Sequence, residues 1–193
     1  MCEPVRRDYS VHDHRGFLAR LRTGFGIDSI RLDADSSSRS AKDAAAGLGA
    51  SLDLGGALIP NLILRGRAAF WASAVRDSPF AYDRGGFAFG LLGAGLDYYV
   101  MPANIYFGGT LGVAGASFVE EYRHRYGDTR HSKAGLGVEL DAGKEWWLAS
   151  ELAIGVAVRA TYISVSSANM FRDYIDGRLH VLHLSLDLSI TYN

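Results

Sequence analysis

Large apolar residues alternate with small or polar ones along the end of the chain, from His180 to Asn193. Every even position from Leu182 to Tyr192 is large and apolar. The odd positions between them are His183, Ser185, Asp187, Ser189 and Thr191. Successive side chains of a β-strand point to opposite faces, so this segment is predicted to be a strand with one apolar and one polar face. Its length suits a bilayer, because about 9 to 11 tilted residues cross the hydrocarbon core as a strand.

The same period of two recurs in seven earlier segments, at about 15–28, 45–57, 62–75, 87–100, 105–117, 134–147 and 152–165. Short turns at 59–61, 101–104 and 148–151 alternate along the chain with longer polar segments at 32–42, 76–86, 119–133 and 166–178. The short turns would lie at one end of the sheet and the long loops at the other, an asymmetry typical of outer-membrane barrels. With an even number of strands, the first and last can pair, which removes the open edges.

The sequence therefore predicts an all-β fold, an eight-stranded antiparallel up-and-down transmembrane β-barrel that spans residues 15–193. Residues 1–14 are polar and without period, so they are expected to form a flexible N-terminal tail. The His12-Asp13-His14 triplet in this tail is expected to be solvated, and no metal site is predicted there.

The polar faces of neighbouring predicted strands carry charges of opposite sign. Arginine occurs on the first, third and seventh strands, and carboxylates occur on the even-numbered ones, so opposite charges would meet across antiparallel pairs. An eight-stranded barrel has room inside for side chains but no open channel, so the interior is expected to be plugged. The predicted interior ion-pair network consists of Arg20, Arg22, Asp53, Arg65, Arg67, Asp97, Glu139, Asp141, Glu145, Arg159 and Asp187, with His183 nearby.

The leucine-rich face is then expected to contact lipid. An alternative is a soluble lipocalin-like barrel, in which this face is the core around a small apolar ligand and the charges stand in water. A soluble exterior would carry many Lys and Glu residues, and the strands contain almost no Lys, which favours the membrane. The predicted lipid-facing residues include Leu21, Leu52, Leu64, Leu96, Leu111, Leu140, Val156 and Leu186. An interfacial aromatic belt is predicted near the short turns, from Phe17, Tyr98, Tyr106, Phe107, Trp146, Trp147 and Tyr192.

Composition excludes several other classes of protein. A formal net charge of −1 and a pI near 6.6 provide no basic surface for nucleic acid. No apolar run reaches the roughly 18 residues that a transmembrane helix needs. The single cysteine, Cys2, cannot form an internal disulfide. Residues 1–16 contain no apolar core of a secretory signal, so an exported protein would be represented here in a processed or recombinant form.

The chain resembles the small outer-membrane β-barrel superfamily of Gram-negative bacteria, of the OmpA-like and OmpX-like eight-stranded type. The resemblance covers about residues 16–193 and rests on the glycine-rich alternation, YYVMPANIYFGGTLG at 98–112, GKEWWL at 143–148 and the C-terminal strand. It implies location in the bacterial outer membrane, with lipopolysaccharide and the barrel-assembly machinery as partners. That machinery commonly reads a final Phe in this family, whereas this chain ends Tyr192-Asn193.

Some barrels of this superfamily are lipid A deacylases with a His, a Ser and an acid on the outer wall, so a lipid-modifying hydrolase is a further alternative. The nearest such residues here are His131, Ser132 and Glu139. Adjacent residues of a strand point to opposite faces, and Glu139 has the parity of the interior, so these groups are not expected to form a catalytic line. We therefore predict no catalytic residue, no cofactor and no enzymatic activity.

The sequence favours a structural or surface-interaction role, with the long loops facing outside. Segments 119–133 and 166–178 are the candidate contacts for an external ligand, because loops held by a rigid scaffold commonly carry binding residues. Segment 119–133 is preferred, since it is rich in basic, acidic and histidine residues.

Overall fold

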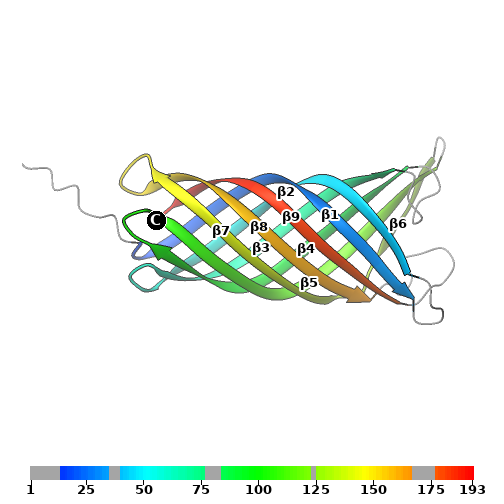
Figure 1. Cartoon of the computed structure of the whole chain (residues 1–193), viewed down its shortest axis with the longest axis horizontal. Helices are drawn as coiled ribbons and strands as arrows, with labels where there is room; N and C mark the ends of the chain where they lie inside the picture. The colour runs from blue at the N-terminus through cyan, green and yellow to red at the C-terminus, as the bar shows by residue number, and fades with distance from the viewer. Residues whose placement is uncertain (1–13, 35–39, 77–83, 123–124, 167–176) are drawn as a thin grey trace, which may run out of the picture.

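The chain forms one closed antiparallel β-barrel in the computed structural model, which describes residues 14–34, 40–76, 84–122, 125–166 and 177–193. Figure 1 shows the strands wound obliquely around the long axis, with the C-terminus among the short turns. Within the described ranges, no helix is long and apolar enough to cross a bilayer. The predicted all-β fold and its up-and-down topology are confirmed.

Nine strand segments build the barrel, and each pairs with its neighbours in antiparallel register. They are β1 (Phe17–Ala34), β2 (Ser40–Ile59), β3 (Leu62–Arg76), β4 (Arg84–Val100), β5 (Ile105–Tyr122), β6 (Arg125–His131), β7 (Gly135–Trp147), β8 (Leu152–Ser166) and β9 (Gly177–Tyr192). The cylinder closes because β1 also pairs with β9, from Ala19 opposite Tyr192 to Ala34 opposite Gly177. Closure pairs the first strand with the last, which would otherwise form two open sheet edges.

Eight positions around the barrel hold these nine segments, because β6 and β7 share one position. Both pair with β5: His131 of β6 lies opposite Ser117, and Gly135 of β7 lies opposite Ala114. The amide of Ser132, between the two segments, donates to the carbonyl oxygen of Ala116 at 2.8 Å. The sixth barrel strand in chain order is thus interrupted at residues 132–134, and the predicted count of eight strands is correct.

The strands run into all four predicted long loops, and furthest into two of them. β1 extends to Ala34 and β2 begins at Ser40, so most of segment 32–42 is strand, as is most of segment 119–133 through β5 and β6. In segments 76–86 and 166–178 the strands include only the residues at the two ends. The apolar alternation stops earlier than the hydrogen-bond ladder, because outward side chains such as Asp33 and Lys42 are polar while their backbones still pair. The connections at 35–39, 77–83, 123–124 and 167–176 lie outside the described residues.

The three short turns lie together at the opposite end of the barrel, where the C-terminus also lies (Figure 1). Asn61 and Asn104 in two of these turns adopt left-handed backbone conformations, with φ of 67° and 52°. Asparagine tolerates this region better than most residues, which fits the tight reversals between β2 and β3 and between β4 and β5.

Candidate functional site

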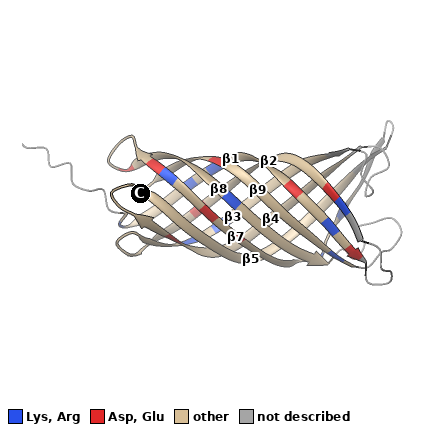
Figure 2. Cartoon of the chain, in the orientation of Figure 1, with Lys and Arg blue, Asp and Glu red and all other residues tan. Residues whose placement is uncertain are grey.

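The outer wall of the barrel carries an apolar belt around its whole circumference. All eight residues predicted to face lipid are exposed, from 38% for Val156 to 65% for Leu140. In Figure 2 most of the length of the strands is uncharged, and several of the charged positions lie near the long-loop end. Further members of the belt come from every barrel position and include Phe25, Leu48, Phe70, Leu92, Val113, Leu136, Val158, Leu184 and Ile190.

The aromatic belt at the short-turn end is smaller than predicted. Tyr106 is fully buried, and its ring lies 5.3 Å from the ring of Tyr99 inside the barrel. Trp147 is only partly exposed, because it packs against His14. At Tyr106 the prediction was wrong, because this residue alternates with the outward-facing Ile105 and Phe107 and its side chain therefore points into the barrel. The remaining five predicted members, Phe17, Tyr98, Phe107, Trp146 and Tyr192, are exposed.

All charged residues of the predicted interior network are buried in the lumen, the enclosed interior of the barrel. Asp97 joins two arginines: its Oδ2 accepts from Arg20 and its Oδ1 accepts from Arg65, both at 2.8 Å. Arg20 also approaches Glu145, with Nε 3.0 Å from Oε1. Arg65 continues the chain through Nη2, which donates to Asp141 Oδ1 at 3.0 Å.

The same chain of contacts continues toward the middle of the barrel. Asp141 Oδ2 accepts from Arg22 at 2.7 Å, and a second nitrogen of Arg22 lies 3.5 Å from Asp53. Asp53 is held by Arg67, which also contacts Glu139. The network ends where Arg159 lies 3.7 Å from Glu139 and 2.6 Å from Asp187.

Such a chain of contacts closes the lumen at this level. The side chains of Arg20, Arg22, Arg65, Arg67 and their carboxylate partners have no exposed surface. Buried charges are tolerated only when they are paired and hydrogen-bonded, and each of these groups has at least one partner of opposite sign. No open aqueous channel passes between these side chains.

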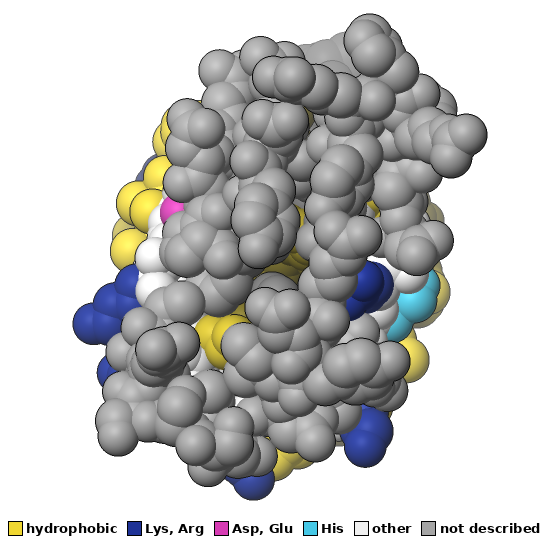
Figure 3. Space-filling view, turned by 90° about the vertical axis from the view of Figure 1, so that its right-hand side faces the viewer, with side chains coloured by type: hydrophobic (Ala, Val, Ile, Leu, Met, Phe, Trp, Pro, Cys, Tyr) yellow, Lys and Arg dark blue, Asp and Glu magenta, His cyan; other side chains and the backbone are white. Residues whose placement is uncertain are grey.

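The lumen nearer the long-loop end is apolar, which the sequence analysis did not predict. Leu179 and Val181 of β9 point inward, as do Phe87 and Phe89 of β4. Inward-facing positions are therefore not polar along the whole length of the strands. Figure 3, which views this end, shows hydrophobic side chains at the centre between the grey residues. The apolar lumen section also contains Ile30, Leu32, Trp71, Leu91, Phe118, Ile163 and Val165.

A polar triplet lies at the junction between the apolar lumen section and the ion pairs. Nδ1 of His183 lies 2.6 Å from Oδ1 of Asp28, and the hydroxyl of Ser73 donates to the other carboxylate oxygen. The imidazole packs 4.1 Å from the indole ring of Trp71. Asp28 was missed by the sequence analysis as a network member, although its even position on β1 gives it the parity of Arg20 and Arg22.

His14 closes the short-turn end, in contrast to the predicted solvated tail. Its imidazole is buried, stacks on the ring of Tyr99 at 3.6 Å, and lies 2.8 Å from the side-chain oxygen of Asn104. The backbone carbonyl of His14 accepts from the amide of Asn61, and Asn193 contacts the second ring nitrogen. Burial lowers the pKa of His14 below its ordinary value, and the hydrogen bond to Asn104 opposes this shift.

The candidate hydrolase residues are not assembled into a catalytic line. Glu139 is in the lumen, where it accepts a hydrogen bond from Thr161 at 3.0 Å and contacts Arg67. The hydroxyl of Ser132 accepts a hydrogen bond from the backbone amide of Ala116 at 2.9 Å. His131 is exposed at the end of β6.

Solved structures of bacterial outer-membrane proteins share this architecture. Neisserial surface protein A superposes with a TM-score of 0.53 at 14% identity, over 90% of this chain and 96% of that chain. OprG from Pseudomonas aeruginosa gives 0.53 at 14% identity, over 95% and 99% of the two chains. The outer membrane protease OmpT from Escherichia coli gives 0.54 at 10% identity, over 92% and 96%. No protein-family model and no curated protein sequence matches the chain.

Proposed function

We propose, on the premise that this chain has the fold of the small bacterial outer-membrane β-barrels, that it is an integral outer-membrane protein with a structural or surface-interaction role. In this proposal the apolar belt contacts lipid hydrocarbon and the long connections face outside. The ion-pair network holds the barrel shut rather than conducting solutes. The proposed role involves no catalysis.

One observation carries the proposal, namely the inverted distribution of side chains. Large aliphatic and aromatic residues are exposed around the full circumference, while arginines and carboxylates are buried inside. Soluble proteins rarely expose contiguous apolar patches of more than a few hundred Å². In a bilayer the same arrangement is favourable, because lipid covers the apolar residues and the backbone polar groups are paired within the closed sheet.

The finer parts of the proposal concern partners. A surface ligand would bind through the segments 119–133 and 166–178, and lipopolysaccharide and the barrel-assembly machinery would be the partners in the membrane. The support is that β5, β6, β8 and β9 meet these segments at the end away from the short turns (Figure 1). Residues 123–124 and 167–176 lie outside the described part of the chain, so for them the proposal depends on composition and on the strands that flank them.

Reconstitution tests the membrane assignment directly. The purified chain is diluted from urea into buffer alone, into detergent micelles and into phospholipid vesicles, and is then run unheated and boiled on a denaturing gel. We expect a faster-migrating unheated band with micelles and vesicles only. A monodisperse, β-rich protein in plain buffer would contradict the proposal and favour the lipocalin-like alternative.

Surface interaction and conduction need separate measurements. Replacing residues 167–176 by a Gly-Ser linker of equal length should weaken binding of protein-coated vesicles to host or bacterial surfaces, with the remaining binding due to segment 119–133, while the heat-modifiable band is retained. A steady single-channel conductance of the wild-type protein in planar bilayers would contradict a lumen closed by ion pairs.

A further inference from the structure

Basic side chains form a row on the outer wall near the long-loop end. Lys42 of β2 lies directly opposite Arg31 of β1, and Arg31 lies opposite His180 of β9. One outward position further along, Arg178 lies opposite Asp33. We call these five residues the rim patch. Directly opposed side chains have Cβ atoms about 4.5–5.5 Å apart, so the charges of this row are close neighbours.

The rim patch has an excess of positive charge. Among its described side chains, Asp33 is the one acid; it accepts from Arg31 Nε at 2.8 Å and lies 3.8 Å from His180 Nε2. Lys42 and Arg178 are exposed, and no contact to Asp33 is seen for either. Like charges placed directly opposite on a sheet are unfavourable unless an anion lies between them. The patch is therefore suited to an anion.

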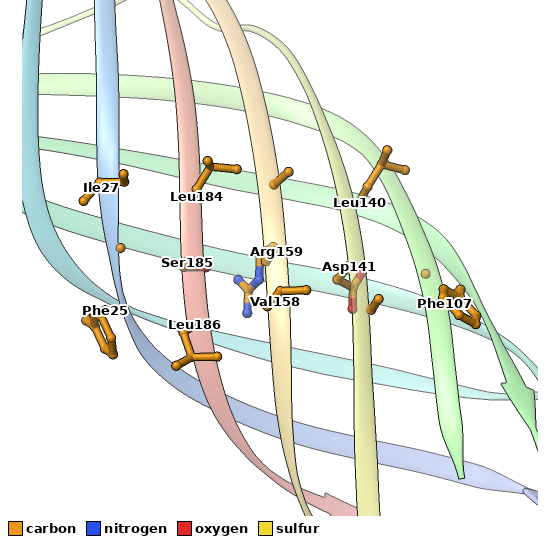
Figure 4. A pocket seen from close by; sticks show the side chains of 14 residues that line it. Phe25, Ile27, Phe107, Leu140, Asp141, Val158, Arg159, Leu184, Ser185 and Leu186 are labelled. Atoms are coloured by element: carbon orange, nitrogen blue, oxygen red, sulfur yellow. The ribbon is translucent and has the colours of Figure 1, made fainter. Parts of the chain in front are cut away.

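An apolar groove begins below the rim patch; it shares β1 and β9 with the patch and continues across β8, β7 and β5. Its volume is about 740 Å³, and its walls are formed by side chains such as Ile27 of β1, Leu184 of β9 and Leu140 of β7. These side chains are exposed on the outer wall, and Figure 4 shows the smaller Val158 beside Leu186, one level below Leu184. The wall is hollowed here because the small residues Ala160 and Ala142 occupy outward positions on β8 and β7.

The patch and the groove have the spacing of a lipid headgroup and its chains. Arg31 follows Ile27 by four residues on the same face of β1, a rise of about 13 Å along the strand. Between the two levels, the hydroxyl of Tyr162 lies 2.7 Å from His180 Nδ1, and the two rings stack at 6.0 Å. Tyrosine at this depth is typical of the boundary between hydrocarbon and headgroups.

We propose that the rim patch and the groove together bind one phosphate-bearing lipid of the leaflet around the long-loop end. Arg31, Lys42 and Arg178 contact its phosphate, and its acyl chains lie in the groove over Val158 and Ala160. The guanidinium fork matches phosphate oxygens, and basic residues at a membrane surface attract anionic lipids. This inference rests on the proposed membrane location and specifies one partner of that function.

The test is native mass spectrometry of the folded full chain released from neutral detergent micelles that contain lipid A, a bis-phosphorylated multi-acyl lipid. We expect one retained lipid A per wild-type barrel. Arg31→Gln together with Lys42→Gln should reduce retention about tenfold, because two charged contacts to phosphate are lost. Ala160→Phe, which fills the groove and changes no charge, should also reduce retention.

The control is Arg15→Gln together with Lys144→Gln, which removes the same charge at the short-turn end of the barrel and should leave retention unchanged. Equal retention by the wild type and the rim-patch variant would overturn the inference, as would equal retention of diacylglycerol, which has no phosphate, or loss of lipid A to added inorganic phosphate. Gel migration of each variant separates the two proposals. A barrel that folds in detergent and retains no lipid refutes this inference alone, whereas a chain that folds in plain buffer refutes the membrane location as well.

Discussion

Asp53 accepts two hydrogen bonds from Arg67, from Nε at 2.5 Å and from Nη2 at 2.8 Å, and neither side chain has any exposed surface. This bidentate pair joins adjacent strands, because Asp53 of β2 lies directly opposite Arg67 of β3. A planar guanidinium that faces a carboxylate in this way fixes both side chains in direction. The pair lies in the middle of the ion-pair network, because Asp53 also contacts Arg22 on one side and Arg67 contacts Glu139 on the other.

Arg67→Met should lower the free energy of unfolding by about 3 to 5 kcal/mol, because it leaves Asp53 and Glu139 buried with one partner fewer. Urea titration of the folded barrel in vesicles measures the change. Arg31→Met is the matched control: its partner Asp33 is exposed, and an exposed pair contributes about 0 to 1 kcal/mol. Equal effects of the two substitutions would mean that water reaches the lumen at Arg67.

Leu186→Arg places a charge on the apolar belt, opposite Phe25 of β1 and Val158 of β8. If this residue lies near mid-bilayer, the free energy of unfolding in vesicles should fall by about 2 to 4 kcal/mol. Leu152→Arg, at the start of β8 beside a short turn, should cost about 0 to 1 kcal/mol near the interface. A larger loss at Leu152 than at Leu186 would show that the hydrocarbon layer is centred elsewhere.

Gly49→Ala should destabilise the barrel by about 1 to 3 kcal/mol, because a Cβ at this position would collide with the indole ring of Trp71 on the neighbouring strand. A β-carbon at Gly115 of β5 would meet no atom within 4 Å. Gly115→Ala is therefore expected to be neutral or slightly stabilising, since it reduces the freedom of the unfolded chain. Unfolding in urea distinguishes the two, and a neutral Gly49→Ala would mean that Trp71 has room to move.

Acidification should open the short-turn end of the barrel at His14. The pKa of His14 is lowered because burial disfavours the imidazolium, so the unfolded segment binds protons more strongly than the folded one. Closure is thus fully stable above pH about 6.5 and weakens as the pH falls below that value toward the lowered folded pKa. The nearby carboxylate of Glu145 raises the pKa of His14 and the guanidinium of Arg20 lowers it, and burial has a larger effect than either.

Hydrogen exchange measures this opening at two amides. The amide of Asn61 donates to the carbonyl of His14 at 3.2 Å, and that of Ala57 donates to the carbonyl of Gly16 at 2.8 Å. Their protection should fall between pH 7 and pH 5 in the wild type and become independent of pH in His14→Gln. The control His131→Gln, an exposed histidine, should keep the wild-type profile. Protection that is unchanged at pH 5 in the wild type would exclude His14 as the titrating group.

Alternation along the strands was sufficient to predict which face of the sheet is enclosed. Arg65 and Asp141 are separated by many residues, yet strand parity placed both in the lumen, where they are hydrogen-bonded. Parity cannot give the chemistry of the lumen at each level, so the apolar lumen section with Phe89 and Val181 was missed. Once a barrel is closed, its inner wall can be filled by ion pairs at one level and by apolar side chains at another.

The two ends of the chain were harder to predict for a different reason. His14 has no periodic neighbours, and its burial depends on Asn104 and Asn193, which only the closed barrel brings beside it. Strand length was underestimated because outward side chains beyond the apolar belt, such as Arg31, are polar like those of loops. At these positions the backbone is still paired, but the side chains no longer alternate between apolar and polar, so the sequence pattern does not indicate a strand.

Pairing of the first strand with the last has a consequence for biogenesis. β1 is synthesised first, yet the inner edge of the seam that it forms with β9 does not exist until the final residues have been added. A nascent chain cannot complete this cylinder step by step from its beginning, and contacts so distant in sequence form slowly. The barrel can therefore close only after β9 has been made, and until then the backbone groups of β1 that face β9 have no partner strand.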